Sequence, residues 1–515
     1  MHLPPARLQF LRLALCALLP LHLAAAEPTA SVSLRDAVQT ALKQSPGLRI
    51  QEAGIEQKSG LLDQASGAFD WVGTGAANVA NNRTPVVDAS GAKSVDRNTE
   101  TTYAVGAGKL FRNGVSIQPS VSVVQQDSHS TSTPTTGASQ LNFQIDVPLL
   151  RGLGTDSTGA TEAAARGDVA VARLLYQHAL TAQAYNTAAA YWNCRAADET
   201  LKLQVDVERA AEKLVESTKV LVDTRVFPPV FLMQAEANLR DKRTVRIEAE
   251  LSAKSARFAL GQVLGLAPEA IAATPTPTDE FPLLSPTSLS IDEASRAALV
   301  QRALADRADL VASRGSLVPL NILARQAESN LKPRLDLTVS AGYRGLSTGG
   351  DPLGPLTQRL TGGNGLVGLS AEWPVRNTYQ HGLLRERRAD LRAAEAQTVQ
   401  LSQQVAGEVL LALEQVRLRA DVVRSAQDTV DIARKAVAAQ YDQLRSGLGT
   451  ILDVINIESL YTSARINNIS AHAAYATAIV QLRYALGSVF ESAADHSFTV
   501  SDLTTPPPLQ PPPVR

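Results

Sequence analysis

Cysteine is nearly absent from this sequence, which has only Cys16 and Cys194 among 515 residues. Cys16 lies in a stretch that we expect to be removed. The bulky Leu15 before it argues against lipid attachment, because a small residue is wanted there. A single remaining cysteine excludes an internal disulfide framework. The helical context "AAAYWNCRAA" predicts that Cys194 is a small buried apolar residue.

Excess charge and long apolar runs are also missing. The formal net charge is −1, so the chain as a whole offers no bulk positive charge to a nucleic acid. After residue 26 the sequence has no uninterrupted run of about 18 apolar residues, which a bilayer-spanning helix needs. If the protein meets a membrane beyond the inner one, it must do so with strands.

The motifs of common enzymes are missing as well. The histidines after residue 26 are far apart, and none forms a metal-binding pair of the HExxH kind. The stretch "VGAGKLF" at Val105–Phe111 has a Gly-Lys pair, but it lacks the upstream glycine and the following Ser or Thr of a phosphate-binding loop. We therefore expect no enzymatic activity, no cofactor and no metal.

The features that are present begin with an export signal. Arg7 and Arg12 form a basic start, an apolar stretch follows, and three small alanines end at Ala26. Pro20 breaks the apolar stretch and no stop-transfer pattern follows. The pattern therefore favours a cleaved signal peptide over a membrane anchor.

The rest of the chain is duplicated. Three sequences of the first half recur in the same order in the second half: "ALKQSPGL" (Ala41–Leu48) as "ALADRADL" (Ala303–Leu310), "LNFQIDVPLL" (Leu141–Leu150) as "VGLSAEWPVR" (Val367–Arg376), and "ALGQVLGL" (Ala259–Leu266) as "ALGSVFES" (Ala485–Ser492). We therefore expect each half to fold as a helix, strands, a long helix, a sharp turn and a returning helix.

These patterns divide the chain into segments. We predict a signal peptide at 1–26, a first repeat at 27–265, a Pro-rich linker at 266–290, a second repeat at 291–490 and a flexible Pro-rich tail at 491–515. Strands are expected within about 68–148 and 333–374, and long helical hairpins at about 161–263 and 383–487.

The long helices contain no proline and very little glycine. Only Gly167 interrupts the stretch from about Thr161 to Arg225, and only Gly407 interrupts the stretch from about Leu383 to Ser446. At a rise of 1.5 Å per residue, each would be a rod of roughly 95 Å. Alanine-rich sequence with narrow apolar stripes resembles coiled-coil seams, so the helices alone favour a coiled-coil rod.

The strands argue against a plain rod. In Leu141–Val147, Leu335–Tyr343 and Val367–Trp373, apolar side chains alternate with polar or small ones, which gives each strand one apolar and one polar face. This pattern suits a sandwich edge, and it also suits a barrel with lipid outside and water inside. Each half has too few strands to close a membrane barrel, so several copies would have to share one.

Together these features resemble the TolC family of outer-membrane efflux proteins. The resemblance rests on the export signal, the duplicated plan, "SLRDAVQTALKQSPGLRI" at 33–50, "PLLRGLG" at 148–154 and the stretch from Gly447 to Gly487. It covers about Ser33 to Phe490. It implies a mainly α fold with a membrane β part, in which a homotrimer forms an α-helical tunnel and one shared outer-membrane β-barrel.

The resemblance also implies a function and partners. The protein would be the exit duct of a tripartite efflux or type I secretion system in the cell outer membrane, extending into the periplasm. It would dock to a periplasmic adaptor and an inner-membrane pump of the RND or ABC type. The outer strand face would contact lipid through Val367, Leu369, Ala371 and Trp373.

Two bends would lie at the periplasmic tip, "DTRVFPPVF" at Asp223–Phe231 and "RSGLGTILD" at Arg445–Asp453. The residues implied in adaptor docking are Arg225, Pro228, Pro229, Gly447 and Gly449. The two glycines should supply unusual backbone angles, and the two prolines should break and restart the helix.

The resemblance places Asp453 and Asn456 at the pore constriction, where the family often carries two acids three residues apart. Phe231 falls where the family can carry another acid. A carboxylate in the first turn of a helix also favours the helix dipole without any role in a pore.

Two alternatives stay open. The first half has about twice as many residues for its strands as the second, whereas the family plan is two membrane strands per half. The surplus, which includes the turn "RNG" at 112–114, could lengthen the strands, fold outside the membrane or enlarge the barrel. The alternative function is a periplasmic coiled-coil adaptor or structural protein of an export complex, which the duplication and the amphipathic strands disfavour.

Overall fold

The computed structural model describes residues 31–87, 90–128, 135–284, 292–348, 362–492 and 498–507. The expected signal peptide and parts of the expected linker and tail lie outside the described residues. The helices are α1 (Leu34–Gln44), α2 (Pro46–Gly67), α3 (Thr155–Thr158), α4 (Ala160–Asp223), α5 (Pro229–Leu264), η1 (Ile271–Ala273), α6 (Glu293–Asp306), α7 (Ala308–Ser329), α9 (Thr378–Arg445) and α10 (Ile451–Ala485). The strands are β1 (Ser31–Val32), β2 (Val72–Val87), β3 (Lys93–Leu110), β4 (Ser116–Ser128), β5 (Thr136–Pro148), β6 (Thr276–Pro277), β7 (Arg334–Thr348), β8 (Gly362–Glu372), β9 (Phe490–Ser492) and β10 (Phe498–Val500).

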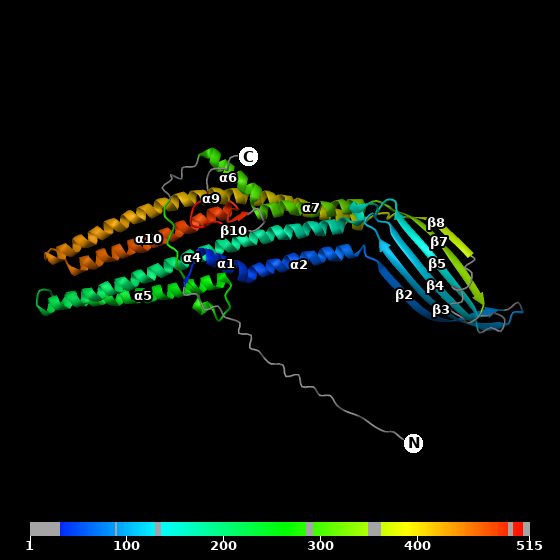
Figure 1. The fold of residues 1–515 in the computed structure, drawn as a ribbon, viewed down its shortest axis with the longest axis horizontal. Helices are drawn as coiled ribbons and strands as arrows, with labels where there is room; N and C mark the ends of the chain where they lie inside the picture. The colour runs from blue at the N-terminus through cyan, green and yellow to red at the C-terminus, as the bar shows by residue number, and fades with distance from the viewer. Residues whose placement is uncertain are drawn as a thin grey trace, which may run out of the picture.

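The molecule is a long helical rod with a curved sheet at one end (Figure 1). The helix α9 has 68 residues, which correspond to about 100 Å at 1.5 Å per residue. The hairpins α4–α5 and α9–α10 both turn at the end of the rod opposite the sheet. The sheet and the two bends are therefore separated by the length of the rod.

The helices form a single layer built from both halves of the chain. Beside the sheet the neighbours run in the order α2, α4, α7, α9, and toward the bends they run in the order α5, α4, α10, α9. No helix among the described residues is both long and apolar enough to cross a membrane.

Two apolar cores hold this layer together near the middle of the rod. One surrounds Trp192 on α4, which is fully buried against residues of α1 and α5 such as Val38 and Leu260. The other joins α9 to α10 through residues such as Val409 and Ile479. Alanine fills many of the remaining contacts, which allows the helices to approach closely. Cys194 is buried as predicted, and burial raises the pKa of its thiol to about 12.

Within the described ranges, six long strands form one antiparallel sheet in the order β2-β3-β4-β5-β7-β8. The first half of the chain supplies four strands and the second half supplies two. The halves join where β5 pairs with β7, for example at Ile145 and Val339. The strands β2 and β8 form the two edges, and β2 follows α2 while β8 leads to α9.

The structure corrects two expectations. The third sequence echo aligned Gly261 with Gly487, but Gly261 lies inside α5, and the counterpart of Gly487 is Gly265. Each of these two glycines follows the end of its helix in the left-handed conformation, with φ of +68° at Gly487 and +75° at Gly265. The tail is not free throughout 498–507, because Leu503 is buried in the core around Trp192.

Candidate functional site

The bends between α4 and α5 and between α9 and α10 share a pair of backbone hydrogen bonds. After α4, Arg225 N–H donates to Val222 O at 2.9 Å and Val226 N–H donates to Leu221 O at 2.8 Å. After α9, Gly447 N–H donates to Leu444 O at 3.1 Å and Leu448 N–H donates to Gln443 O at 3.0 Å. This pair of bonds is the Schellman motif, which satisfies the last carbonyls of a helix.

The motif needs one residue with a positive φ, and the two bends supply it differently. Gly447 has φ +75°, which glycine adopts without strain, whereas Arg225 has φ +60°, which costs a residue with a Cβ roughly 1–2 kcal/mol. Gly449 does not have the positive φ that we expected. It is instead constrained by space, because a Cβ at this position would lie 3.0 Å from Gln440 Nε2.

The returning helices also begin differently. Pro228 is the N-cap of α5 and Pro229 is its first residue, so a missing N–H falls where a helix leaves its N–H groups unpaired. Thr450 caps α10 in a capping box: Asp453 Oδ2 accepts hydrogen bonds from the backbone N–H and the hydroxyl of Thr450 at 2.9 and 2.7 Å. These bonds lower the pKa of the Asp453 carboxyl.

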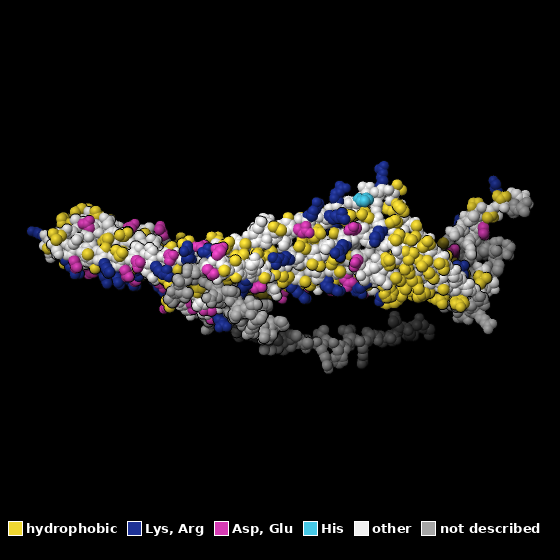
Figure 2. All heavy atoms as spheres, turned by 90° about the horizontal axis from the view of Figure 1, so that it is seen from above, with side chains coloured by type: hydrophobic (Ala, Val, Ile, Leu, Met, Phe, Trp, Pro, Cys, Tyr) yellow, Lys and Arg dark blue, Asp and Glu magenta, His cyan; other side chains and the backbone are white. Residues whose placement is uncertain are grey.

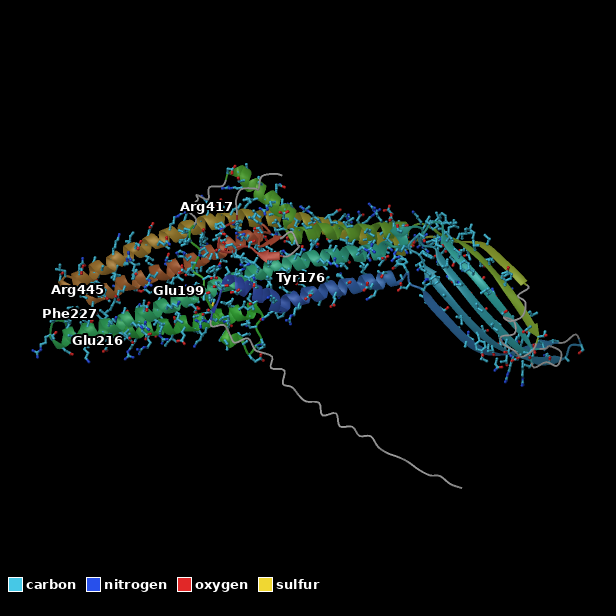
Figure 3. All side chains as sticks on the ribbon, in the orientation of Figure 1. Tyr176, Glu199, Glu216, Phe227, Arg417 and Arg445 are labelled. Carbon is cyan, nitrogen blue, oxygen red and sulfur yellow. The ribbon has the colours of Figure 1, made fainter. Side chains whose placement is uncertain are left out.

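Asp453 and Asn456 are both exposed at the second bend, one turn apart on α10. The corresponding position in the first bend is Phe231, whose ring contacts Phe227 edge to face at a centroid distance of 5.3 Å. Figure 3 labels Phe227 and Arg445, which lie at the two bends. The same end of the molecule therefore has an aromatic tip and an acidic tip.

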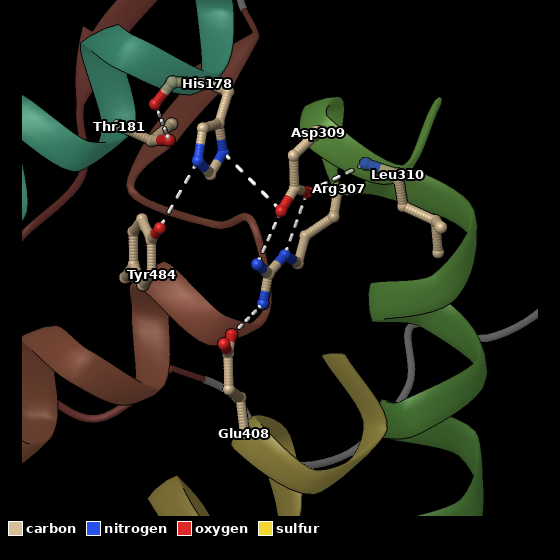
Figure 4. A network of polar contacts seen from close by, with 7 residues as sticks. All are labelled: His178, Thr181, Arg307, Asp309, Leu310, Glu408 and Tyr484. Atoms are coloured by element: carbon tan, nitrogen blue, oxygen red, sulfur yellow. Dashed lines mark hydrogen bonds and ion pairs between the residues drawn. The ribbon is translucent and has the colours of Figure 1, made fainter. Parts of the chain in front are cut away.

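A buried ion cluster joins four helices in the middle of the rod (Figure 4). Arg307, at the junction of α6 and α7, has a side chain that is 5% exposed. It donates to Asp309 Oδ2 at 2.6 Å and to Glu408 of α9. His178 of α4 lies 3.9 Å from Asp309 and 3.4 Å from the hydroxyl of Tyr484 of α10.

The charges in this cluster compensate one another. Burial acts against the charge of Arg307, but its hydrogen bonds to Asp309 and Glu408 outweigh burial and raise its pKa. Burial would likewise raise the pKa of Asp309, but the Arg307 guanidinium lowers it overall. The pKa of His178 is lowered, chiefly by burial, so the imidazole resists protonation in the folded protein.

Sequence reasoning did not find this cluster. Its signal was in the first echo, where the "ALADRADL" stretch places Arg307 and Asp309 opposite Ser45 and Gly47. Charged residues aligned with small ones at a repeated, buried position indicate that one repeat holds an ion pair. Ser45 is 5% exposed, so both junctions are buried.

Over the part of the sheet nearer the helices, the strands β3, β4, β5, β7 and β8 largely separate apolar from polar side chains. Cross-strand partners lie on the same face, and one face holds Val105, Val121, Leu141, Tyr343 and their neighbours. The other face holds partners such as Ala104 and Ser122, or Asp146 and Thr338. Figure 2 shows the apolar side chains gathered over the sheet, while charged side chains cover much of the rod.

Val367, Leu369 and Ala371 lie on the apolar face of β8, where Val367 pairs with Val339 and Leu369 with Leu337. Val367 and Leu369 are 77% and 66% exposed. Trp373 follows the last residue of β8 and is 77% exposed. These large exposed apolar groups would be unfavourable in water, which indicates an apolar medium or partner at this face.

A single chain thus combines a sheet with an exposed apolar face and two helical hairpins whose bends both lie at the far end of the rod (Figure 1). Residues 299–488 match the model of the family described as outer membrane efflux protein. No curated protein sequence matches the chain.

Solved structures of outer-membrane channels share the fold over most of the chain. The outer-membrane channel OprN is 18% identical with a TM-score of 0.67, and the match covers 88% of this chain and 90% of that one. CmeC of Campylobacter jejuni is 16% identical with a TM-score of 0.67, covering 88% and 85%. The open state of MtrE of Neisseria gonorrhoeae is 19% identical with a TM-score of 0.61, covering 88% and 88%. The chain therefore shares the fold of these outer-membrane channels, and residues 299–488 match the outer membrane efflux protein model.

Proposed function

We propose that three copies of this chain form the outer-membrane exit duct of a tripartite efflux or type I secretion system. The sheets would line a passage through the outer membrane, and the helices would continue it across the periplasm. The hairpin bends would meet a periplasmic adaptor, which links the duct to an inner-membrane pump of the RND or ABC type. Cargo would pass without being chemically changed.

One observation carries this proposal: the exposed apolar face of the sheet and the two hairpin bends lie at opposite ends of one rod. A duct that crosses a membrane and docks to a partner far from it needs this arrangement. A periplasmic adaptor, the second candidate, would have no use for an exposed apolar sheet face, so we favour the duct.

The tips would provide both docking and selectivity. Arg225, Pro228, Pro229, Gly447 and Gly449 shape the bends that we propose as adaptor contacts. Three-fold symmetry would bring three Asp453 carboxylates and three Asn456 amides toward the axis. A ring of carboxylates attracts cations, so the passage should be mildly cation-selective.

Fractionation and cross-linking test the function. The protein extracted in mild detergent should come from the outer membrane as a trimer, and cross-linking in cells should capture an adaptor at Leu448→Cys, which lies at the exposed second bend. A protein that fractionates with the periplasm or the inner membrane would support the adaptor reading. The same cross-linker placed at Ser370, on the sheet, is the matched control and should capture no adaptor.

A further inference from the structure

The resemblance to the efflux family implied two membrane strands in each half, but the first half contributes four to the sheet. The additional pair is the hairpin β3–β4. We propose that this hairpin is part of the membrane wall, so that three copies of six strands close a barrel of eighteen. This inference rests on the proposed trimeric duct and concerns the width of its outer exit.

The hairpin has the same division of faces as the strand β5 beside it. Val105 of β3 pairs with Val121 of β4, and Val121 pairs with Leu141 of β5. On the opposite face Ala104 pairs with Ser122, which pairs with Gln140. A hairpin that folded in water outside the membrane would have no reason to continue the apolar face of its neighbours.

Aromatic side chains mark both borders of the apolar face. Toward the helices they are Trp71, Phe111 and Trp373, and toward the far end they are Tyr103 and Tyr343, all substantially exposed. Phe111 and Tyr103 belong to the additional hairpin or its turn. Membrane barrels carry such aromatic girdles at both interfaces.

The distance between the girdles fits a bilayer. Trp373 follows Glu372, which pairs with Arg334, so its level lies ten residues along β7 from Tyr343. At about 3.3 Å per residue and a tilt of about 40°, the girdles are roughly 25 Å apart along the barrel axis. This is the height of the apolar band of outer-membrane barrels, about 25 Å.

The turn of the β3–β4 hairpin is fixed to the end of the helical layer beside the sheet. Arg112 donates to Glu162 of α4 through Nε at 2.6 Å and through Nη2 at 3.1 Å. Its guanidinium lies 4.8 Å from the centre of the Phe69 ring, just after α2. Gly114 has φ +94°, and a Cβ there would lie 2.1 Å from Gly152 O, so the turn packs directly on the strand-to-helix connection. The hairpin therefore occupies a defined place between α2 and α4.

The additional strands make the sheet as wide as the helical layer. Four helices 8–10 Å apart span about 32–40 Å. Strands about 4.8 Å apart and tilted by about 40° take up about 6.3 Å each, so six strands span about 38 Å, within that range, whereas four would span about 25 Å. Eighteen strands would thus continue the helical tunnel without narrowing, with a backbone diameter of about 36 Å.

Single cysteines in the full chain test the placement of the hairpin. Val105→Cys and Val121→Cys report the apolar face, Ala104→Cys and Ser122→Cys the polar face, and Val367→Cys and Ser370→Cys serve as references in β8. Each is labelled with a fluorophore in lipid nanodiscs, with and without spin-labelled lipid that quenches it. The native Cys194 is buried and does not interfere.

We expect lipid quenching at positions 105, 121 and 367, and at least threefold weaker quenching at 104, 122 and 370. Quenching at 367 without quenching at 105 and 121 would place the hairpin outside the membrane and overturn the eighteen-stranded barrel, while the duct itself would stand. An absence of quenching at 367 would overturn the duct as well. Electron microscopy of the unmodified trimer provides a count that needs no variant: eighteen strands support the inference and twelve refute it.

Discussion

The bend after α4 and the bend after α9 follow the same backbone path with almost no side chain in common. Arg225 stands where the second bend has Gly447, Phe227 where it has Gly449, and Phe231 where it has Asp453. The two backbone hydrogen bonds of the Schellman motif are present in both. The duplicated fold thus fixes the turn geometry, and the residues that differ can adapt each tip to its own contacts.

The two helix junctions in the middle of the rod show the same contrast. Ser45 joins α1 to α2 and Arg307 joins α6 to α7, and both are buried. Gly265 lies against the first junction. A Cβ on Gly265 would be 2.7 Å from Gln44 O, so the two backbone segments pack directly against each other. At the second junction Gly487 has more room beside Arg307, and charge takes the place of close backbone packing.

The largest expected effect comes from breaking the charged junction. Arg307→Met should leave the largely buried Asp309 carboxylate without its cation and lower the unfolding free energy by about 3 kcal/mol. Arg424→Met, which breaks an exposed pair with Asp421, should cost under about 1 kcal/mol. Denaturant unfolding in detergent compares the two. Equal effects would mean that the cluster is not needed to join the halves.

Smaller changes in the unfolding free energy are expected at the two bends, and they should have opposite signs. Gly447→Ala should destabilise by about 1 kcal/mol because alanine is strained at positive φ, and Arg225→Gly should relieve the same strain. Gly407→Ala, inside α9 with open space around it, should stabilise by about 0.5–1 kcal/mol. The trimer should persist in all three variants. Its loss in Gly447→Ala would show that the bend is needed for assembly.

Asp453 has two suggested roles, as a charge in the pore and as part of a helix cap, and two variants separate them. Asp453→Asn removes the proposed ring charge, whereas Thr450→Ala weakens the helix cap and keeps the carboxylate. In planar bilayers Asp453→Asn should reduce the cation preference and Asn456→Asp should increase it, with sharper block by multivalent cations. Thr450→Ala should lower thermal stability by about 1 kcal/mol without moving the reversal potential. If Asp453→Asn behaves like Thr450→Ala, the carboxylate is structural.

The smallest expected effect is a pH dependence of stability. The lowered pKa of His178 means that below its ordinary value of 6.5 the unfolded chain binds a proton that the folded chain resists, so stability falls as the pH drops. Asp309, with a lowered pKa, adds stability above its ordinary value of 3.8 and loses it only in stronger acid. Between pH 7.5 and 5.5 the melting temperature should therefore fall less in His178→Gln than in the parent. The exposed His381→Gln is the control, and a parent-like profile in both variants would exclude His178 as the cause.

The sequence was sufficient for the plan of the fold. Period-2 alternation in Val367–Trp373 and proline-free stretches of sixty residues have few structural solutions, and their repetition showed a duplicated chain. The sequence did not determine how strands β3 and β4 are used, because a hairpin with alternating residues satisfies the same pattern inside or outside a sheet. The ion cluster was missed because its members come from α4, α7, α9 and α10, and no local pattern links residues so far apart.

The central claim is that the chain crosses the outer membrane with its bends on the periplasmic side. Impermeant maleimide labelling of intact cells tests it with two variants, Ser94→Cys near the far end of the β2–β3 hairpin and Leu448→Cys at the second bend, both at exposed positions. The account predicts that Ser94→Cys is labelled in intact cells, and that Leu448→Cys is labelled only after the outer membrane is permeabilised. Protection of both positions in intact cells, with labelling of both after permeabilisation, would place the whole molecule in the periplasm and contradict the account.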